Sequence, residues 1–247
     1  KIDLNMSIDN LKHGGYSVAD PQGNKDKGEE TKSNINVKYL TDGGTEFELG
    51  YDLNDSENRY PNALTKVQFD ENPAQNSLGR VYTISDKQSD ALTYEVKRQF
   101  NDNFSLQRRS SITNKETITK QYDWWNGVKI TYGPLTKSQY DYRSSENILT
   151  YVNGNLKIDG GYSSFQGKRT NPIKNYYYEE KNTTTKNNLG LFTNIQYKSK
   201  DTTYSIGARK ERVEFEYIPL SEGIYNSGKH HLEAYDVGFN SSLSPQT

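Results

Sequence analysis

The sequence predicts an all-β chain whose antiparallel strands run up and down as the wall of a transmembrane β-barrel. Apolar and polar residues alternate strictly in several segments, which gives each predicted strand one apolar and one polar face. Tight turns alternate along the chain with long polar connections. The 247 residues are only 31% hydrophobic, which is little for a single globular core of this length. The apolar faces therefore need an apolar environment other than a core.

The first octet, KIDLNMSI, sets the alternation, because every second residue is apolar and the residues between are polar. The same pattern recurs in the segments 33–40, 45–53, 91–100, 156–165, 188–197 and 233–239. Side chains of a strand point to its two faces in turn, so each pattern assigns one face to lipid and the other to water. We expect lipid contact for Ile2, Leu4, Leu49, Val96, Leu191 and Phe239, and a position lining the lumen for Asp3, Glu48, Lys97 and Asp159.

The connections follow the same order. Short turns rich in Gly, Asn or Asp are predicted at 41–44, 101–103, 153–155 and 199–201, on one side of the sheet. Long polar connections are predicted at 21–32, 60–86, 126–136, 171–185 and 220–229, on the other side. This count gives about ten strands, and the asymmetry is typical of outer-membrane barrels. A soluble β-sandwich is the alternative, but its strands are usually shorter and its loops lack this rule.

The composition excludes several classes of function. With 31 basic and 32 acidic residues and no basic block, a nucleic-acid partner is not expected. The absence of cysteine excludes disulfides and thiolate metal sites. No apolar run approaches the roughly 20 residues of a membrane helix. His13, His230 and His231 lack the spacing of a catalytic metal site, and we read them as solvated, with haem ligation as the alternative. We predict no enzyme activity, catalytic residue, metal or cofactor.

Aromatic and arginine side chains near strand ends are the best candidates for ligand binding. Flat rings give a large contact area at small entropic cost, which suits an aromatic iron chelate, and a lumen-facing arginine attracts an anion. The alternative for the aromatics is the girdle at headgroup level. Of the two adjacent arginines, one faces the lumen and the other is expected beyond the lipid. The candidates are Trp124, Trp125, Tyr132, Tyr176, Tyr177, Tyr178, Arg108 and Arg109.

Three segments resemble TonB-dependent outer-membrane receptors. The segment 51–76 resembles their strand-to-loop passage, although Asn62 follows Pro61 where Gly is commoner. The segment 186–218 resembles a strand, a tight turn and a returning strand with a Gly-x-Arg step, here Gly207, Ala208 and Arg209. The segment 231–247 resembles the strand that follows. The resemblance implies about ten strands of a larger barrel of the 22-strand type.

The resemblance also implies a domain organisation and a function. Residues 1–247 are expected to be a portion of the barrel, with the plug domain and the C-terminal strands outside this sequence. The implied activity is import of a scarce ligand across the bacterial outer membrane, first of all a ferric siderophore. Haem, cobalamin or another cofactor, and a non-transport porin or adhesin, are the alternatives. The implied partners are the iron chelate or similar small ligand, the TonB complex through a plug segment, and outer-membrane lipid and lipopolysaccharide.

Overall fold

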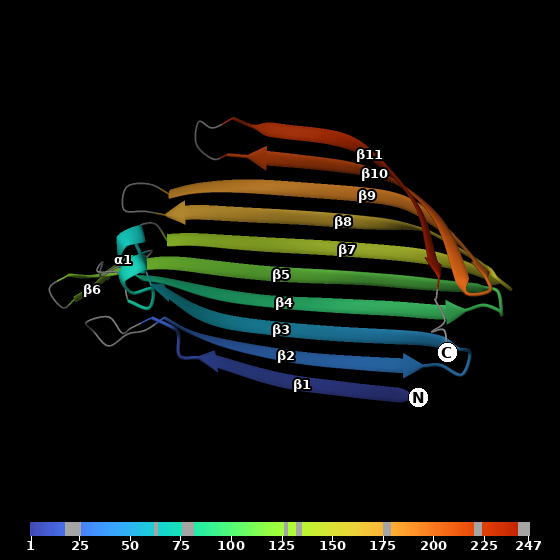
Figure 1. Ribbon diagram of the computed structural model, residues 1–247, viewed down its shortest axis with the longest axis horizontal. Coiled ribbons are helices and arrows are strands. Elements are labelled where there is room, and N and C mark those ends of the chain that lie inside the picture. The colour runs from blue at the N-terminus through green and yellow to red at the C-terminus, as the bar shows by residue number, and fades with distance from the viewer. Residues whose placement is uncertain are drawn as a thin grey trace.

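The computed structural model describes residues 1–17, 26–61, 64–75, 82–125, 128–131, 135–174, 179–219 and 224–241. These residues form one antiparallel sheet of 11 strands (Figure 1). The strands are β1 (Ile2–His13), β2 (Lys27–Leu40), β3 (Thr45–Pro61), β4 (Tyr82–Gln99), β5 (Phe104–Trp125), β6 (Val128–Thr131), β7 (Leu135–Asn153), β8 (Leu156–Lys174), β9 (Glu179–Ser199), β10 (Thr202–Ile218) and β11 (Asn226–Ser241). One short helix, α1 (Lys66–Glu71), lies between β3 and β4.

The strands follow one another in the sheet in chain order. Each pairs with the next along the path β1-β2-β3-β4-β5-β7-β8-β9-β10-β11, and the short β6 pairs with the end of β5. Among the described residues, β1 and β11 each pair with a single neighbour, so the sheet does not close on itself. The prediction of an all-β, up-and-down sheet of about ten strands is therefore confirmed. β6 is an addition that the sequence did not predict.

The predicted short turns gather at one end of the sheet. Between β2 and β3 the amide of Thr41 donates to the carbonyl of Thr45 at 2.9 Å, and Gly44 takes a φ of +73°. Gly154, with a φ of +55°, turns β7 into β8, and Lys200, with a φ of +50°, turns β9 into β10. These turns lie at the right of Figure 1, whereas α1 and β6 lie at the left. The expected division into a short-turn end and a loop end is confirmed.

Several strands are longer than the alternation predicted. β5 has 22 residues and β9 has 21. The expected connections 171–185, 21–32 and 220–229 are partly strand, because β8 continues to Lys174, β2 begins at Lys27 and β11 begins at Asn226. Backbone pairing continues there although both faces are polar, so alternation carries no signal. The expected connection 60–86 contains α1, where Thr65 and Gln68 form a capping box.

The two faces of the sheet differ sharply in polarity. One face, here called the outward face, carries an apolar band formed by alternate residues of 2–8, 35–39, 47–53, 92–96, 104–112, 149–151, 156–162, 189–197, 204–208 and 235–239. The opposite, luminal face is mainly polar. Among the described residues, no helix is long and apolar enough to cross a bilayer.

The predicted facing of the named residues is confirmed. Ile2, Leu4, Leu49, Val96, Leu191 and Phe239 share the outward face, and Asp3, Glu48, Lys97 and Asp159 share the luminal face. Leu49 is 50% exposed, Leu191 62% and Phe239 80%, so no second layer of protein covers them. A β-sandwich would bury these residues against a second sheet, and this alternative is therefore wrong.

The first connection at the loop end is closed by an aspartate. Asp26 accepts hydrogen bonds from the backbone amides of Tyr16 at 2.8 Å and Ser17 at 2.6 Å, and from the Ser17 hydroxyl. Burial alone would raise the pKa of Asp26, but these hydrogen bonds outweigh burial and lower the pKa. The carboxylate thus ties the end of β1 to the start of β2.

Candidate functional site

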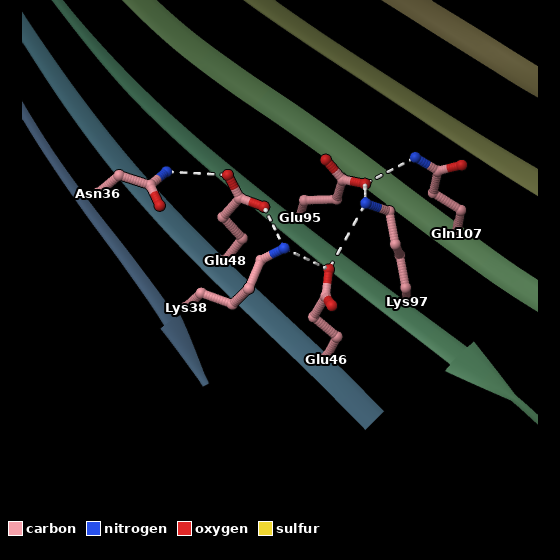
Figure 2. A network of polar contacts seen from close by, with 7 residues as sticks. All are labelled: Asn36, Lys38, Glu46, Glu48, Glu95, Lys97 and Gln107. Carbon is pink, nitrogen blue, oxygen red and sulfur yellow. Dashed lines mark hydrogen bonds and ion pairs between the residues drawn. The ribbon is translucent and has the colours of Figure 1, made fainter. Parts of the chain in front are cut away.

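The luminal face near the short-turn end carries a chain of polar contacts across four strands, β2 to β5 (Figure 2). Lys38 contacts Glu46 at 3.2 Å and Glu48 at 3.7 Å, and Lys97 contacts Glu46 at 3.6 Å and Glu95 at 2.7 Å. Each lysine lies between two glutamates, so the charges are largely balanced. Two amides extend the chain, since Asn36 donates to Glu48 at 2.9 Å and Gln107 donates to Glu95 at 2.6 Å.

This network makes the wall polar and fixed rather than reactive. The carboxylates accept hydrogen bonds from ammonium and amide groups, so their oxygens are engaged. Ion pairs that are partly exposed contribute modestly to stability, but a connected network holds the side chains in place. Among the described residues, no three His, Asp or Glu side chains converge as a metal site would require.

A hollow of about 650 Å³ lies on the luminal face farther from the short turns. Arg209 donates to the Ser163 hydroxyl at 2.9 Å and pairs with Glu211 at 3.2 Å. Asn188 donates to the same Glu211 at 2.8 Å. Arg109 lines the hollow from β5. We call it the luminal hollow; three cations, Arg109, Lys186 and Arg209, line it together with two carboxylates, Glu146 and Glu211, and with hydroxyl and amide groups.

Aromatic rings continue the luminal face toward the loop end. The ring centroids of Tyr140 and Tyr142 are 5.9 Å apart, and those of Tyr142 and Phe165 are 5.8 Å apart. Two cations approach Tyr140, since Arg169 Cζ lies 5.2 Å and Lys115 Nζ 5.7 Å from its ring centroid. These five residues form the luminal aromatic cluster. Its rings are only partly covered, so they present flat surfaces beside positive charge.

The luminal aromatic cluster was not predicted from the sequence. Tyr140 and Tyr142 have the spacing of residues on one strand face, which is a signal that was available. Phe165 and Lys115 come from β8 and β5, and the register that brings them beside β7 is not readable from local sequence. The luminal aromatic cluster could therefore be identified only in the structure.

The two adjacent arginines separate as expected, but one of them lies in an unexpected place. Arg109 faces the lumen, opposite Glu95 and Glu146. Arg108 faces outward, with its Cζ 5.8 Å from the ring centroid of Tyr94. The expected position beyond the apolar band is wrong, because Arg108 lies within the band, between Leu106 and Ile112 on its own strand. The register of β5 sets this position.

The remaining predicted ligand residues stay predictions. Trp124 and Trp125 end β5, where the backbone pairs with Lys129 and Val128 of β6. Nothing is described of these two side chains. Tyr132 lies outside the described residues, and so do Tyr176, Tyr177 and Tyr178, which belong to the connection between β8 and β9.

The predicted histidines do not converge. His230 faces the lumen and stacks on Phe215, with ring centroids 5.7 Å apart, whereas the adjacent His231 faces outward opposite Arg212. His13 lies at the end of β1, at the other edge of the sheet. These positions are far apart in the strand order.

The architecture defines the class of structure: an antiparallel sheet with an exposed apolar band outside, a polar lumen, and short turns at one end only. No family model matches the sequence. No curated protein matches it either.

Solved structures match the sheet closely in shape. The copper transporter OprC has a TM-score of 0.73 at 11% identity, over 98% of this chain and 40% of that chain. The ferric citrate transporter FecA in its unliganded form has a TM-score of 0.72 at 12% identity, over 89% of this chain and 34% of that chain. The ferric-catecholate import receptor Fiu from E. coli K12, in its closed form, has a TM-score of 0.70 at 11% identity, over 98% and 44%.

These neighbours are TonB-dependent receptors and transporters of the bacterial outer membrane. The chain spans 34% to 44% of the length of these three proteins. The fold is therefore that of part of the barrel wall of such receptors.

Proposed function

We propose that the chain is part of a TonB-dependent receptor of the bacterial outer membrane that imports a scarce ligand. The observation that carries the proposal is the similarity of nearly the whole sheet to the barrels of such receptors. An exposed apolar band on one face and a polar wall on the other support the membrane location, because a barrel places lipid outside and water inside.

The ligand that the luminal face suits best is an anionic iron chelate such as a ferric siderophore. The luminal hollow offers two guanidinium groups, from Arg109 and Arg209, which bind carboxylate or phenolate oxygens well. The luminal aromatic cluster offers flat rings beside two further cations. Two of the three neighbours reported above are named for ferric citrate and ferric catecholate, which supports this ligand class. The same proposal assigns ligand contact to the predicted loop tyrosines 176–178.

The remaining parts of the transport system are proposed by analogy with TonB-dependent receptors. A plug domain, further strands that close the barrel, and energy from the TonB complex belong to this proposal, and so do contacts of the outward face with phospholipid and lipopolysaccharide. No chemistry on the ligand is involved.

The proposal is tested with the intact protein in cells that lack their own siderophore receptors. Uptake is measured for a panel of ferric siderophores, haem, cobalamin and copper, each labelled with a radioisotope of its own metal, with and without a functional TonB complex. We expect uptake of a ferric siderophore that stops when the TonB complex is absent. Uptake that persists without the complex identifies a passive porin instead. Uptake of none of the panel, by protein correctly inserted in the outer membrane, contradicts import of these ligands.

A further inference from the structure

Polar side chains interrupt the apolar band between β5 and β7. On β5, apolar Leu106 is followed at the next two outward positions by Arg108 and Ser110. On β7, Asn147 and Ser145 lie opposite these two residues. We call Arg108, Ser110, Ser145 and Asn147 the polar notch.

The apolar band surrounds the polar notch on most sides. Leu106 and Leu149 lie toward the short-turn end, Ile112 lies toward the loop end on β5, and Tyr162 follows on β8. All four are at least 38% exposed, so they belong to the surface and not to a core. On β7 the notch opens toward the loop end, where Arg143 is the next outward residue.

The polar notch satisfies its own hydrogen bonds only in part. The Ser110 hydroxyl donates to the Ser145 hydroxyl at 3.1 Å, and Asn147 donates weakly to the same oxygen at 3.5 Å. Arg108 contacts the face of Tyr94 at 5.8 Å. Among the described residues, no carboxylate pairs with Arg108. Within the described part of the chain its guanidinium donors therefore lack a carboxylate acceptor, which is costly in hydrocarbon.

The depth of Arg108 argues against a lipid headgroup as its acceptor. Arg108 is midway between Phe104 and Ile112, the ends of the apolar stretch of β5. A rise of ~3.3 Å per residue and a tilt of ~40° put it about 10 Å from either edge of that stretch. Lipid phosphates lie outside the hydrocarbon region, and the contact with Tyr94 holds the guanidinium at its own level.

A second copy of the chain does not supply an acceptor either. Copies of a membrane protein are related by an axis along the membrane normal, so each residue meets residues of equal depth. Within the apolar band as bounded above, Arg108 is the only charged outward residue of the described wall. Outward carboxylates such as Asp90 and Glu233 lie beyond the ends of the band, and both already have partners, Asn114 and Lys210. A symmetric contact would therefore offer Arg108 apolar groups, its own copy, or the neutral hydroxyl and amide groups of a second notch, but no carboxylate.

We propose that the polar notch is the docking site of a different protein of the same membrane, one that presents a carboxylate at mid-depth. The carboxylate pairs with Arg108, and a hydroxyl or amide beside it bonds to Ser110 and Asn147. Such charge complementarity fixes register more than it adds affinity. The inference rests on the membrane location given in the proposed function.

The test places a photoreactive phenylalanine analogue in the intact protein within its native membrane, at Leu149 beside the notch or at Leu4 on β1, four strands away from β5. We expect one protein adduct from Leu149, with an Asp or Glu in the cross-linked peptide, and lipid adducts alone from Leu4. Arg108→Leu should lower the Leu149 adduct at least about tenfold, because it leaves the partner's carboxylate unpaired at mid-depth. Arg108→Lys should restore part of it, and Arg143→Leu is the matched control that leaves it unchanged.

Three results overturn the docking site. These are an adduct of Leu149 with lipid alone, an adduct with a second copy of the chain, and a protein adduct that Arg108→Leu does not reduce. The heat-resistant migration of the folded barrel shows for each variant that folding is intact. If Leu4 gives no lipid adduct, the membrane location fails, and with it the proposed function. The two failures are therefore distinguishable.

Discussion

A charge placed on the outward face should destabilise the protein according to its depth, and Leu49→Arg is the sharpest case. Leu49 is 50% exposed and has Val37 and Tyr94, both outward and apolar, opposite it on the neighbouring strands. Its apolar stretch, 47–53, rises about 15 Å at ~3.3 Å per residue and ~40° tilt, and Leu49 lies about 5 Å above its lower end. An arginine near the midplane of a barrel costs about 2 to 4 kcal/mol. We expect a loss of about 2 to 3 kcal/mol.

The measurement is reversible denaturant unfolding of the intact barrel in lipid vesicles, followed by tryptophan fluorescence. The matched control is Asp55→Arg, which lies on the same face of β3 beyond the apolar stretch and should cost less than about 1 kcal/mol. Equal effects of the two substitutions, or a loss below about 0.5 kcal/mol for Leu49→Arg, would show that the outward face does not contact lipid.

Three further predictions concern the fit of the sheet, the first connection and the ligand. Gly161→Ala should destabilise the barrel by about 1 to 3 kcal/mol in the same assay, because the new methyl group collides with a backbone carbonyl of β7. The control Gly160→Ala should be close to neutral, because no atom lies within 4 Å of the methyl group that it adds. Ser17→Ala should raise the pKa of Asp26 toward its ordinary value of 3.8, as measured by NMR titration. Because folding lowers this pKa, the ionised carboxylate stabilises the fold fully at a pH above 3.8, and this stabilisation is lost as the pH falls through the pKa of the folded state. An unchanged pKa would contradict the observed closure. Replacing the tyrosines 176–178 together with Ala should weaken binding of the imported chelate by about 2 to 4 kcal/mol in a binding titration without changing expression or heat resistance; unchanged binding would assign them to the girdle or to idle surface.

The sequence was a good guide wherever the two faces of a strand meet different environments. The octet 1–8 revealed β1 because its outward residues are all apolar and its luminal residues all polar. The turns at 41–44 and 153–155 were readable because a positive φ favours Gly, which stands at 44 and 154. The backbone conformation of a turn and the difference in polarity between the two faces of a strand depend on local residues, so both can be predicted from a single sequence.

Strand ends and luminal clusters could not be predicted from the sequence, because they depend on how strands pair and not on local sequence. Beyond the apolar band, β8 and β9 continue with mainly polar residues on both faces, and strand pairing rather than alternation defines them. The luminal aromatic cluster joins Tyr140 to Phe165 and Lys115 through the registers of β5, β7 and β8. Register is a property of strand pairs, and its specification by one strand is weak where both faces are polar.

One of the strands that alternation failed to reveal, β7, has an unusual outward face. Over residues 145–151, the outward face of β7 has two apolar residues, Leu149 and Tyr151, followed toward the loop end by Asn147 and Ser145, whereas the luminal face carries apolar Ile148. A strand in contact with lipid alone would gain stability from apolar residues at these positions. Its polar outward face therefore implies another neighbour than lipid, and the same absence of contrast that hid β7 from the sequence pattern marks the position where a protein partner is expected.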